Sequence, residues 1–429
     1  MKNMKRFAAL GLAVVMAASL AACGGKKEET TTTQAAGGEA AGGEASGDAS
    51  GVTGDNVKLS LFAGSIPENT PTGGALKVMA DYINENSNGT LTATAFYDTA
   101  LGDATSMVQG LQQGTVDIGV SGTAYFSGLV PEVEVFQLPF LFSNLEEARA
   151  AVDGPAKDAI FEKMSASGII GLAFWENGFR ELSNNVKPIK TPDDMKGIKM
   201  RTLPAEVQVE TWKAMGALPA TIDASELYTA LQQGTVSAQD NPLHEIVSRK
   251  FYEVQPYVTL TDAVYTPFLM AMSEATWNKL SDSQKEVIMK AAEVAREEQL
   301  KLTDEAQAEA LQTLLDNGVT VEENPDKEAF KEKAMPTWSL FTDQCGTEIL
   351  DLIQSNLGAS ADTADTEEAA DTESAAAEED AAVADTEEAA EDAGAEAAEE
   401  AEDTEAAADD AAETEAESVE DAAETEAAE

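Results

Sequence analysis

Arg201 lies in a short apolar segment, residues 198–204 with the sequence IKMRTLP, and it is the side chain best suited to binding a carboxylate. A planar guanidinium can donate two parallel hydrogen bonds to a carboxylate, and it does so best when rigid backbone aims it. The preceding residues predict a short helix, with Thr191 as N-cap, Pro192 in the first turn and Gly197 as C-cap. A strand is therefore expected to follow Gly197 and to present Arg201 near its end. The pattern also fits an arginine that closes an internal salt bridge.

Two further strand ends carry polar side chains that could meet Arg201. An apolar run at residues 168–174 predicts a buried strand that leads to Trp175, Asn177 and Arg180. A later strand is expected to end at the sequence QDNP, which contains Asn241. Arginine and asparagine at strand ends suit the binding of a small anion in a cleft.

The amino terminus carries three cations, an apolar run at residues 7–20 that is short for a membrane span, and then the sequence LAAC at 20–23. With these features, residues 1–22 resemble a bacterial lipoprotein signal peptide. The resemblance implies cleavage before Cys23 and a lipid on its sulfur. The alternative is an ordinary secretory signal followed by an unrelated cysteine. No later segment offers about twenty apolar residues, so the lipid would be the only membrane attachment.

Low-complexity segments flank the remaining chain. Residues 23–56 are rich in Gly, Ala, Ser, Thr and Glu, which predicts a flexible linker after Cys23. Residues 358–429 contain 30 Asp and Glu and no Lys or Arg, which predicts a disordered acidic tail. The net charge of the whole chain is −52, and removing the tail still leaves an acidic body. This charge argues against nucleic-acid binding.

Residues 57–357 are long enough for two lobes, and an internal repeat supports that division. Residues 103–116 read DATSMVQGLQQGTV and residues 223–236 read DASELYTALQQGTV. Each copy predicts a helix with an acidic residue at its start, a glycine at its end and a strand after it. We therefore expect an α/β protein with two lobes and a ligand cleft between them.

Helical periodicity continues from Ser281 to Asn317, with Ser281 as N-cap and Gly318 as C-cap. A continuous helix of this length extends roughly 55 Å, which exceeds the width of one lobe, roughly 40 Å. It would then span both lobes. The alternative is a break near residues 303–304, where Thr303 could cap a second helix.

The chain contains, in this order, the five segments ENGFRELSN at 176–184, PDDMKGIKMR at 192–201, ELYTALQQGTV at 226–236, QDNPL at 239–243 and KFYEVQPY at 250–257. Together they resemble the extracytoplasmic solute-binding proteins of TRAP transporters, of the dicarboxylate-binding type. The resemblance implies a two-lobe periplasmic-binding-protein-like fold. It also implies a receptor that captures a small organic acid and delivers it to a TRAP-type membrane permease, outside the cytoplasm.

The resemblance also assigns residues to the ligand site. It places the selectivity arginine at Arg201, a second arginine at Arg180 and the cleft asparagine at Asn241. Trp175 would offer a flat wall or would belong to the core. Phe62 and Tyr125, expected at strand ends of the first lobe, are weaker candidates to close over the ligand. Where family members often carry larger or charged side chains, this sequence has Ala263, Ala224 and Gly122. Glu68 is either a candidate for binding a hydroxyl group of a sugar acid or an exposed loop residue, and the second reading is favoured.

Other classes of function have less support in the sequence. His244 is the only histidine, and no cysteine and histidine cluster predicts a metal site or a cofactor site. A lipoprotein enzyme acting on carbohydrate or organic acid would need paired carboxylates in the cleft. An acidic adhesin or cation-binding surface protein would leave the two-lobe body unexplained. We therefore expect a binding protein rather than an enzyme, with the identity of the acid left open.

Overall fold

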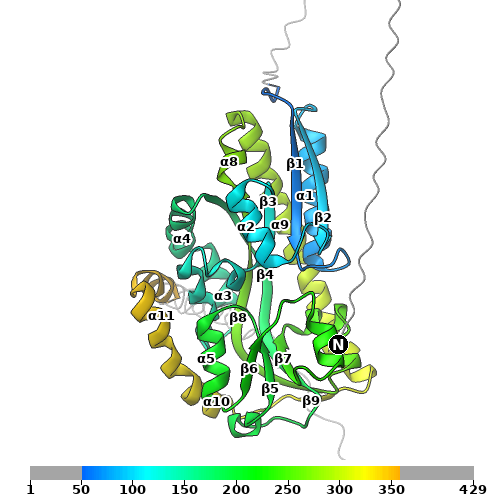
Figure 1. Cartoon of the computed structure of the whole chain (residues 1–429), viewed down its shortest axis with the longest axis vertical. Coiled ribbons are helices and arrows are strands. Elements are labelled where there is room, and N and C mark those ends of the chain that lie inside the picture. Colours follow the sequence, from blue (N-terminus) through cyan, green and yellow to red (C-terminus); the bar gives the residue numbers. More distant parts are fainter. Residues whose placement is uncertain (1–50, 358–429) are drawn as a thin grey trace, which may run out of the picture. The chain divides into compact units, whose positions relative to one another are not determined.

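The computed structural model describes residues 51–357, which form a mixed α/β structure built on one twisted sheet (Figure 1). The strands are β1 Val57–Gly64, β2 Leu91–Asp98, β3 Ile118–Gly122, β4 Ile169–Asn184, β5 Lys199–Thr202, β6 Leu218–Thr221, β7 Ala238–Asn241, β8 Tyr257–Ser273 and β9 Thr320–Glu322. The sheet order is β2-β1-β3-β8-β4-β7-β5-β6, with β9 paired to β8.

The helices cover the faces of this sheet and connect its strands. The α-helices are α1 Pro71–Asn86, α2 Ala104–Gln113, α3 Leu145–Asp153, α4 Pro155–Ala166, α5 Glu206–Ala214, α6 Leu227–Gln232, α7 Leu243–Ser248, α8 Glu274–Trp277, α9 Asp282–Asp316, α10 Lys327–Ala334 and α11 Trp338–Cys345. Five 3-10 helices lie between them: η1 Thr123–Phe126, η2 Pro131–Gln137, η3 Pro192–Met195, η4 Phe251–Glu253 and η5 Met335–Thr337.

Two long strands join the two lobes. β4 has 16 residues and β8 has 17, and the two pair antiparallel along most of their length. At one end β8 pairs with β3, which continues the sheet to β1 and β2 of the first lobe. At the other end β4 pairs with β7, which continues it to β5 and β6 of the second lobe. Residues at the edge where these groups of strands meet can therefore face one cavity.

The long helix α9 is continuous over 35 residues, so the alternative of a break near residues 303–304 does not hold. Its first half packs Ile288, Ala291 and Ala295 into the hydrophobic core of the first lobe. Its last turns pack Ala310 and Leu314 into a core cluster of the second lobe. One rigid element therefore contacts both lobes, as the sequence led us to expect.

The two copies of the repeat differ at their start. Asp103 caps α2 by accepting a 2.7 Å hydrogen bond from the Ser106 amide, as predicted. Asp223 does not cap a helix, because α6 begins only at Leu227. Its carboxylate instead accepts hydrogen bonds from Ser225 and from Ser65 of the first lobe. The second copy still has an acidic residue at the helix start, because Glu226 occupies the N-cap position of α6, but it makes no side-chain capping hydrogen bond.

The linker expected to reach residue 56 ends earlier. Thr53 donates its amide to the Ser283 hydroxyl, and Asp55 accepts a 2.9 Å hydrogen bond from the Gln284 side chain. These contacts attach the chain to the first turn of α9. Cys23, the rest of the expected linker and the acidic tail at 358–429 lie outside the described residues.

Within residues 51–357, no helix is both long enough and apolar enough to cross a membrane.

Candidate functional site

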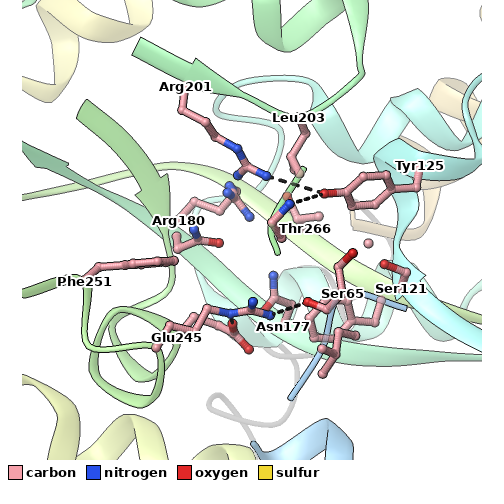
Figure 2. A pocket seen from close by; sticks show the side chains of 16 residues that line it. Ser65, Ser121, Tyr125, Asn177, Arg180, Arg201, Leu203, Glu245, Phe251 and Thr266 are labelled. Carbon is pink, nitrogen blue, oxygen red and sulfur yellow. Dashed lines mark hydrogen bonds and ion pairs between the residues drawn. The ribbon is translucent and has the colours of Figure 1, made fainter. Parts of the chain in front are cut away.

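One cavity collects polar side chains from both lobes (Figure 2). They surround about 420 Å³ of space free of protein atoms, including its opening to solvent. The lining residues are Ser65, Ile66, Ser121, Gly122, Tyr125, Asn177, Arg180, Arg201, Leu203, Ala224, Asn241, Glu245, Arg249, Phe251, Thr266 and Phe268. Four of the six residues predicted for the ligand site are among them: Arg201, Arg180, Asn241 and Tyr125.

Local sequence explains how Arg201 comes to point into this cavity. Thr191 and Asp194 form a capping box that starts the 3-10 helix η3. Gly197 adopts φ +79°, a left-handed conformation that glycine accepts without steric cost, and it ends the turn. The chain then enters β5, where Arg201 is held between parallel strands. The predicted helix, glycine and strand are confirmed, with the helix in the tighter 3-10 form.

Among the described residues 51–357, Arg201 is a buried cation without an acidic partner. Its side chain is 1% exposed. Its Nε donates a 2.8 Å hydrogen bond to the Ile222 carbonyl oxygen, and one terminal nitrogen lies 3.5 Å from the Tyr125 hydroxyl. It forms no ion pair with any carboxylate in the described part of the chain, so the internal salt bridge is ruled out there. Burial lowers the pKa of this guanidinium, and a carboxylate ligand would supply the missing negative charge.

Arg180 has a different environment from the one expected. It forms a buried ion pair with Asp240, in which Nε lies 3.1 Å from Oδ2 and a terminal nitrogen 3.2 Å from Oδ1. The same terminal nitrogen donates to the Asp240 carbonyl oxygen. The guanidinium lines the cavity, but its charge is already balanced. Arg180 can therefore offer hydrogen bonds to a ligand while contributing little uncompensated charge.

Asn241 and Tyr125 approach the cavity from opposite lobes. Asn241 ends β7, and its Nδ2 donates to the Gln239 side chain. Tyr125 lies on η1 of the first lobe, and its hydroxyl accepts a 3.1 Å hydrogen bond from the Ala224 amide of the second. Tyr125 therefore closes one wall of the cavity and links the two lobes beside Arg201 (Figure 2).

Trp175 and Phe62 do not line the cavity. Both are core residues, with Trp175 1% and Phe62 0% exposed, and each packs in a hydrophobic cluster. β1 continues beyond Phe62 to Gly64, so Ser65 and Ile66 reach the cavity instead. Ala224 and Gly122 do line it, whereas Ala263 is a buried residue of β8 outside the lining and Glu68 lies exposed elsewhere.

Several lining residues were not singled out from the sequence. Glu245 and Arg249 form an ion pair one helical turn apart, from α7 to the residue after it. Asn177 was expected at a strand end but was not assigned to the site. Thr266 lies inside β8, where nothing in the sequence distinguishes it from a core residue. For these missed residues, the one pattern visible in the sequence is the i,i+4 spacing of Glu245 and Arg249, which predicts an ion pair on a helix.

The sequence matches one protein family over most of the described chain. A profile described as "Bacterial extracellular solute-binding protein, family 7" matches residues 62–344. A "Solute-binding protein" of Verminephrobacter eiseniae (strain EF01-2) is 35% identical, over 68% of this chain and 87% of the relative. The "2,3-diketo-L-gulonate-binding periplasmic protein YiaO" of Escherichia coli (strain K12) is 32% identical, over 67% of this chain and 84% of the relative.

Solved structures agree with these relatives. A TRAP periplasmic solute binding protein from Polaromonas sp. JS666, bound to D-erythronate, has a TM-score of 0.67 at 34% identity, over 70% of this chain and 98% of that one. The sugar acid binding protein DctPAm from Advenella mimigardefordensis strain DPN7T, in complex with galactonate, has a TM-score of 0.69 at 34% identity, over 71% and 99%. The two-lobe α/β fold expected from the sequence is thereby confirmed. The chain belongs to the bacterial extracellular solute-binding proteins of family 7, the DctP family of TRAP solute-binding proteins.

Proposed function

We propose that this protein captures a small organic acid between its two lobes, with the carboxylate at Arg201, and delivers it to a TRAP-type permease. The observation that carries the proposal is the buried charge of Arg201, which has no ion-pair partner in the described part of the chain and faces a cavity shared by both lobes. A buried charge is costly unless it is paired. A carboxylate ligand pairs with it through two parallel hydrogen bonds.

The neighbours of Arg201 favour an anion over a neutral ligand. Arg180 is neutralised by Asp240, so Arg201 supplies the net positive charge on this side of the cavity. Asn241 and the Tyr125 hydroxyl can complete the contacts of a carboxylate and of the atoms next to it. Two solved relatives are bound to carboxylate ligands, D-erythronate and galactonate, which supports the same chemistry here.

The test is an affinity measurement on Arg201 variants. A thermal-shift screen of the full-length protein against C4-dicarboxylates, 2-oxo acids, sugar acids and aromatic acids first identifies a ligand. A ligand at 100 times its dissociation constant adds about 2.7 kcal/mol of stability. Calorimetry on Arg201→Met is then expected to show a loss of about 2–5 kcal/mol of binding free energy, the cost of removing one partner of a buried charge pair.

Arg149 provides the matched control. It pairs with Glu176 and Asp304 outside the cavity and is about one-third exposed. Arg149→Met removes a guanidinium of the same size, and the affinity is expected to stay within about twofold because no ligand contact is lost. Unchanged affinity in Arg201→Met, or equal losses in both variants, would contradict the proposed role of Arg201. A screen in which no acid binds would contradict the proposed function as a whole.

Membrane attachment and the absence of turnover complete the proposal. We infer a lipid on Cys23 that holds the protein at the outer face of the cell membrane, with the ligand released unchanged to the permease. The chain's family is one of transport receptors rather than an enzyme class. Intact mass of the membrane-extracted protein should carry the lipid, and Cys23→Ser should release the protein from membranes. Conversion of any bound acid during prolonged incubation would overturn the inference that the protein is no enzyme.

A further inference from the structure

Three polar side chains of the cavity wall have a buried atom without a hydrogen-bond partner in the described structure. These atoms are Glu245 Oε1, Asn177 Oδ1 and Thr266 Oγ1. The three residues are only 2%, 3% and 1% exposed. Buried polar atoms in folded proteins are almost always paired. Three unpaired atoms on one cavity therefore indicate a ligand that carries complementary groups.

Glu245 defines which kind of group this is. Burial alone would raise the pKa of its carboxyl, but the charges of Arg249 and His244 and a hydrogen bond from Arg249 outweigh burial and lower it. The side chain is therefore an anion near neutral pH, and an ionised carboxylate only accepts hydrogen bonds. Arg249 donates to Oε2, which leaves Oε1 free for a donor on the ligand. A hydroxyl group fits this requirement, whereas a second ligand carboxylate has no proton to donate to Oε1.

Arg249 already has a partner in each lobe. Its Nε is bound to Glu245, and one of its terminal nitrogens donates a 3.0 Å hydrogen bond to the Ser65 carbonyl oxygen. Its positive charge is thus balanced by Glu245 and its position is fixed between the lobes. The pair contributes no net charge to the cavity, in contrast to Arg201.

Asn177 and Thr266 add two more hydrogen-bonding positions on rigid backbone. Asn177 belongs to β4, and its backbone carbonyl oxygen lies 2.7 Å from the His244 ring nitrogen Nε2. Its side-chain amide can bind a hydroxyl group through either Oδ1 or the NH₂ group. Thr266 belongs to β8, and its hydroxyl can both donate and accept. Figure 2 shows Glu245 and Asn177 on the side of the cavity opposite Arg201 and Tyr125.

We propose that the ligand is a polyhydroxylated monocarboxylate, an open-chain sugar acid, whose hydroxyl groups bind Glu245, Asn177 and Thr266 while its carboxylate binds Arg201. This assignment rests on the proposed function and adds the chemistry of the ligand's other end. Within the described residues, Arg201 on one side of the cavity has no acidic partner, and Glu245 on the other side lacks a hydrogen-bond donor for Oε1. A ligand with one carboxylate and hydroxyl groups beyond it pairs with both residues. A dicarboxylate pairs only with Arg201.

The experiment compares three classes of acid on the full-length protein by calorimetry. The first class is D-gluconate, D-xylonate and L-threonate, the second is succinate, fumarate and glutarate, and the third is butanoate and hexanoate. The tightest sugar acid is expected to bind at least tenfold more tightly than every member of the other two classes. Leaving the buried acceptors of the cavity unpaired is the source of that difference.

Two variants test the residues. Thr266→Val removes the hydroxyl with little change in shape, and it should weaken the tightest sugar acid about tenfold. Glu245→Gln removes the negative charge, and it should weaken the same sugar acid while succinate binding stays constant or improves. A purely structural role for Glu245 would weaken both ligands by the same factor. Ser87→Ala, which loses a buried hydroxyl of the first lobe that is not part of the cavity lining, is the control and should leave all affinities unchanged.

The outcomes separate the two proposals. If succinate, fumarate or glutarate binds more tightly than every sugar acid, the ligand assignment is overturned while the role of Arg201 as carboxylate anchor stands. If sugar acids bind best but Thr266→Val and Glu245→Gln leave the preference unchanged, the assigned residues are overturned. If no acid of any class binds, the proposed function itself fails.

Discussion

The Ser65 hydroxyl donates a 2.6 Å hydrogen bond to Asp223 Oδ1, although the two residues lie 158 positions apart and belong to different lobes. The same serine also binds its own lobe, because its hydroxyl accepts a 2.9 Å hydrogen bond from the Ala104 amide. Its carbonyl oxygen accepts from Arg249 of the second lobe. Ser65 therefore makes hydrogen bonds between the two lobes at the wall of the cavity.

The first prediction is that loss of the hydrogen bond between Ser65 and Asp223 weakens ligand binding. Ser65→Ala removes the hydrogen bond to Asp223 without changing any charge, and the two lobes lose a contact to an ionised acceptor. Burial would raise the pKa of Asp223, but its hydrogen bonds lower it, so this carboxylate is charged near neutral pH. We expect the ligand to bind about tenfold more weakly, roughly 1.5 kcal/mol, mainly through faster dissociation. Stopped-flow fluorescence measures the association rate and the dissociation rate separately.

Ser87→Ala is the matched control for this variant. The Ser87 hydroxyl donates to the Leu91 carbonyl oxygen and accepts from the Leu91 amide, both within the first lobe. Its loss should lower the free energy of unfolding and leave the ligand's dissociation rate unchanged. Equal dissociation rates in Ser65→Ala and in the unmodified protein would mean that this contact does not hold the cleft closed.

The second prediction concerns the buried ion pair of Arg180 and Asp240, whose side chains are 2% and 3% exposed. Asp240→Asn leaves the Arg180 charge without its partner, and breaking such a pair costs about 3–5 kcal/mol of unfolding free energy. The control is Asp153→Asn, which breaks the partly exposed pair with Arg296 and should cost about 1 kcal/mol or less. Urea titration measures both.

The ligand offers a second measurement on the same variant. An organic acid in the cavity would partly neutralise the unpaired Arg180, so it should raise the melting temperature of Asp240→Asn more than that of the unmodified protein. A variant as stable as the unmodified protein would show that the pair is dispensable. A smaller ligand-induced shift would place the ligand's carboxylate away from Arg180.

The sequence predicted the Arg201 side of the site better than the opposite side. The position of Arg201 could be predicted because a helix cap, a glycine at the helix end and the strand that follows are each recognised from a few consecutive residues. Glu245 and Thr266 reach the cavity only through the packing of α7 and the pairing of β4 with β8. Those relationships join residues far apart in the chain, and a single sequence does not contain them.

Trp175 and Asn177 show how a local irregularity defeats a strand pattern. Residues two apart on a regular strand share a face, so both would be expected to point the same way. The register of β4 against β8 shifts between Trp175 and Gly178. Such a bulge changes the direction of side chains, and here Trp175 joins the core while Asn177 lines the cavity.

The third prediction is a pH dependence that arises at Glu181. Burial and the neighbouring Asp262 raise the pKa of its carboxyl well above the ordinary value. The folded state then holds a proton that the unfolded state releases above about pH 4.3. The contribution of Glu181 to stability is therefore complete at low pH. It is lost as the pH rises from there towards the folded-state pKa, by up to about 1.4 kcal/mol per pH unit.

Glu181→Gln tests this, because glutamine mimics the protonated carboxyl at every pH. Its free energy of unfolding, relative to the unmodified protein, should rise between pH 5 and pH 8. Asp194→Asn is the control of opposite sign. A hydrogen bond from Lys187 lowers the pKa of Asp194 to about 2, so its contribution is constant over this range and is lost only in acid. A constant difference between Glu181→Gln and the unmodified protein from pH 5 to pH 8 would show that Glu181 is ionised throughout.

The last prediction concerns residues 358–429, which carry 30 acidic side chains and no basic ones. Every residue that lines the cavity lies between Ser65 and Phe268, so deleting the acidic segment removes none of the contacts described for the site. At physiological salt the Debye length is about 8 Å, and charges farther away than this act weakly on an anionic ligand. We expect the deletion to change the dissociation constant by less than about threefold in 150 mM salt. In 10 mM salt the Debye length is about 30 Å, so the acidic segment acts on the ligand from farther away. The association rate of the deletion variant should then exceed that of the full chain, because a repulsive field has been removed.

Stopped-flow measurements at both salt concentrations give the association rates and the dissociation constants of the two proteins. A large loss of affinity in 150 mM salt would mean that the acidic segment takes part in binding, and a large gain would mean that it competes with the ligand for Arg201.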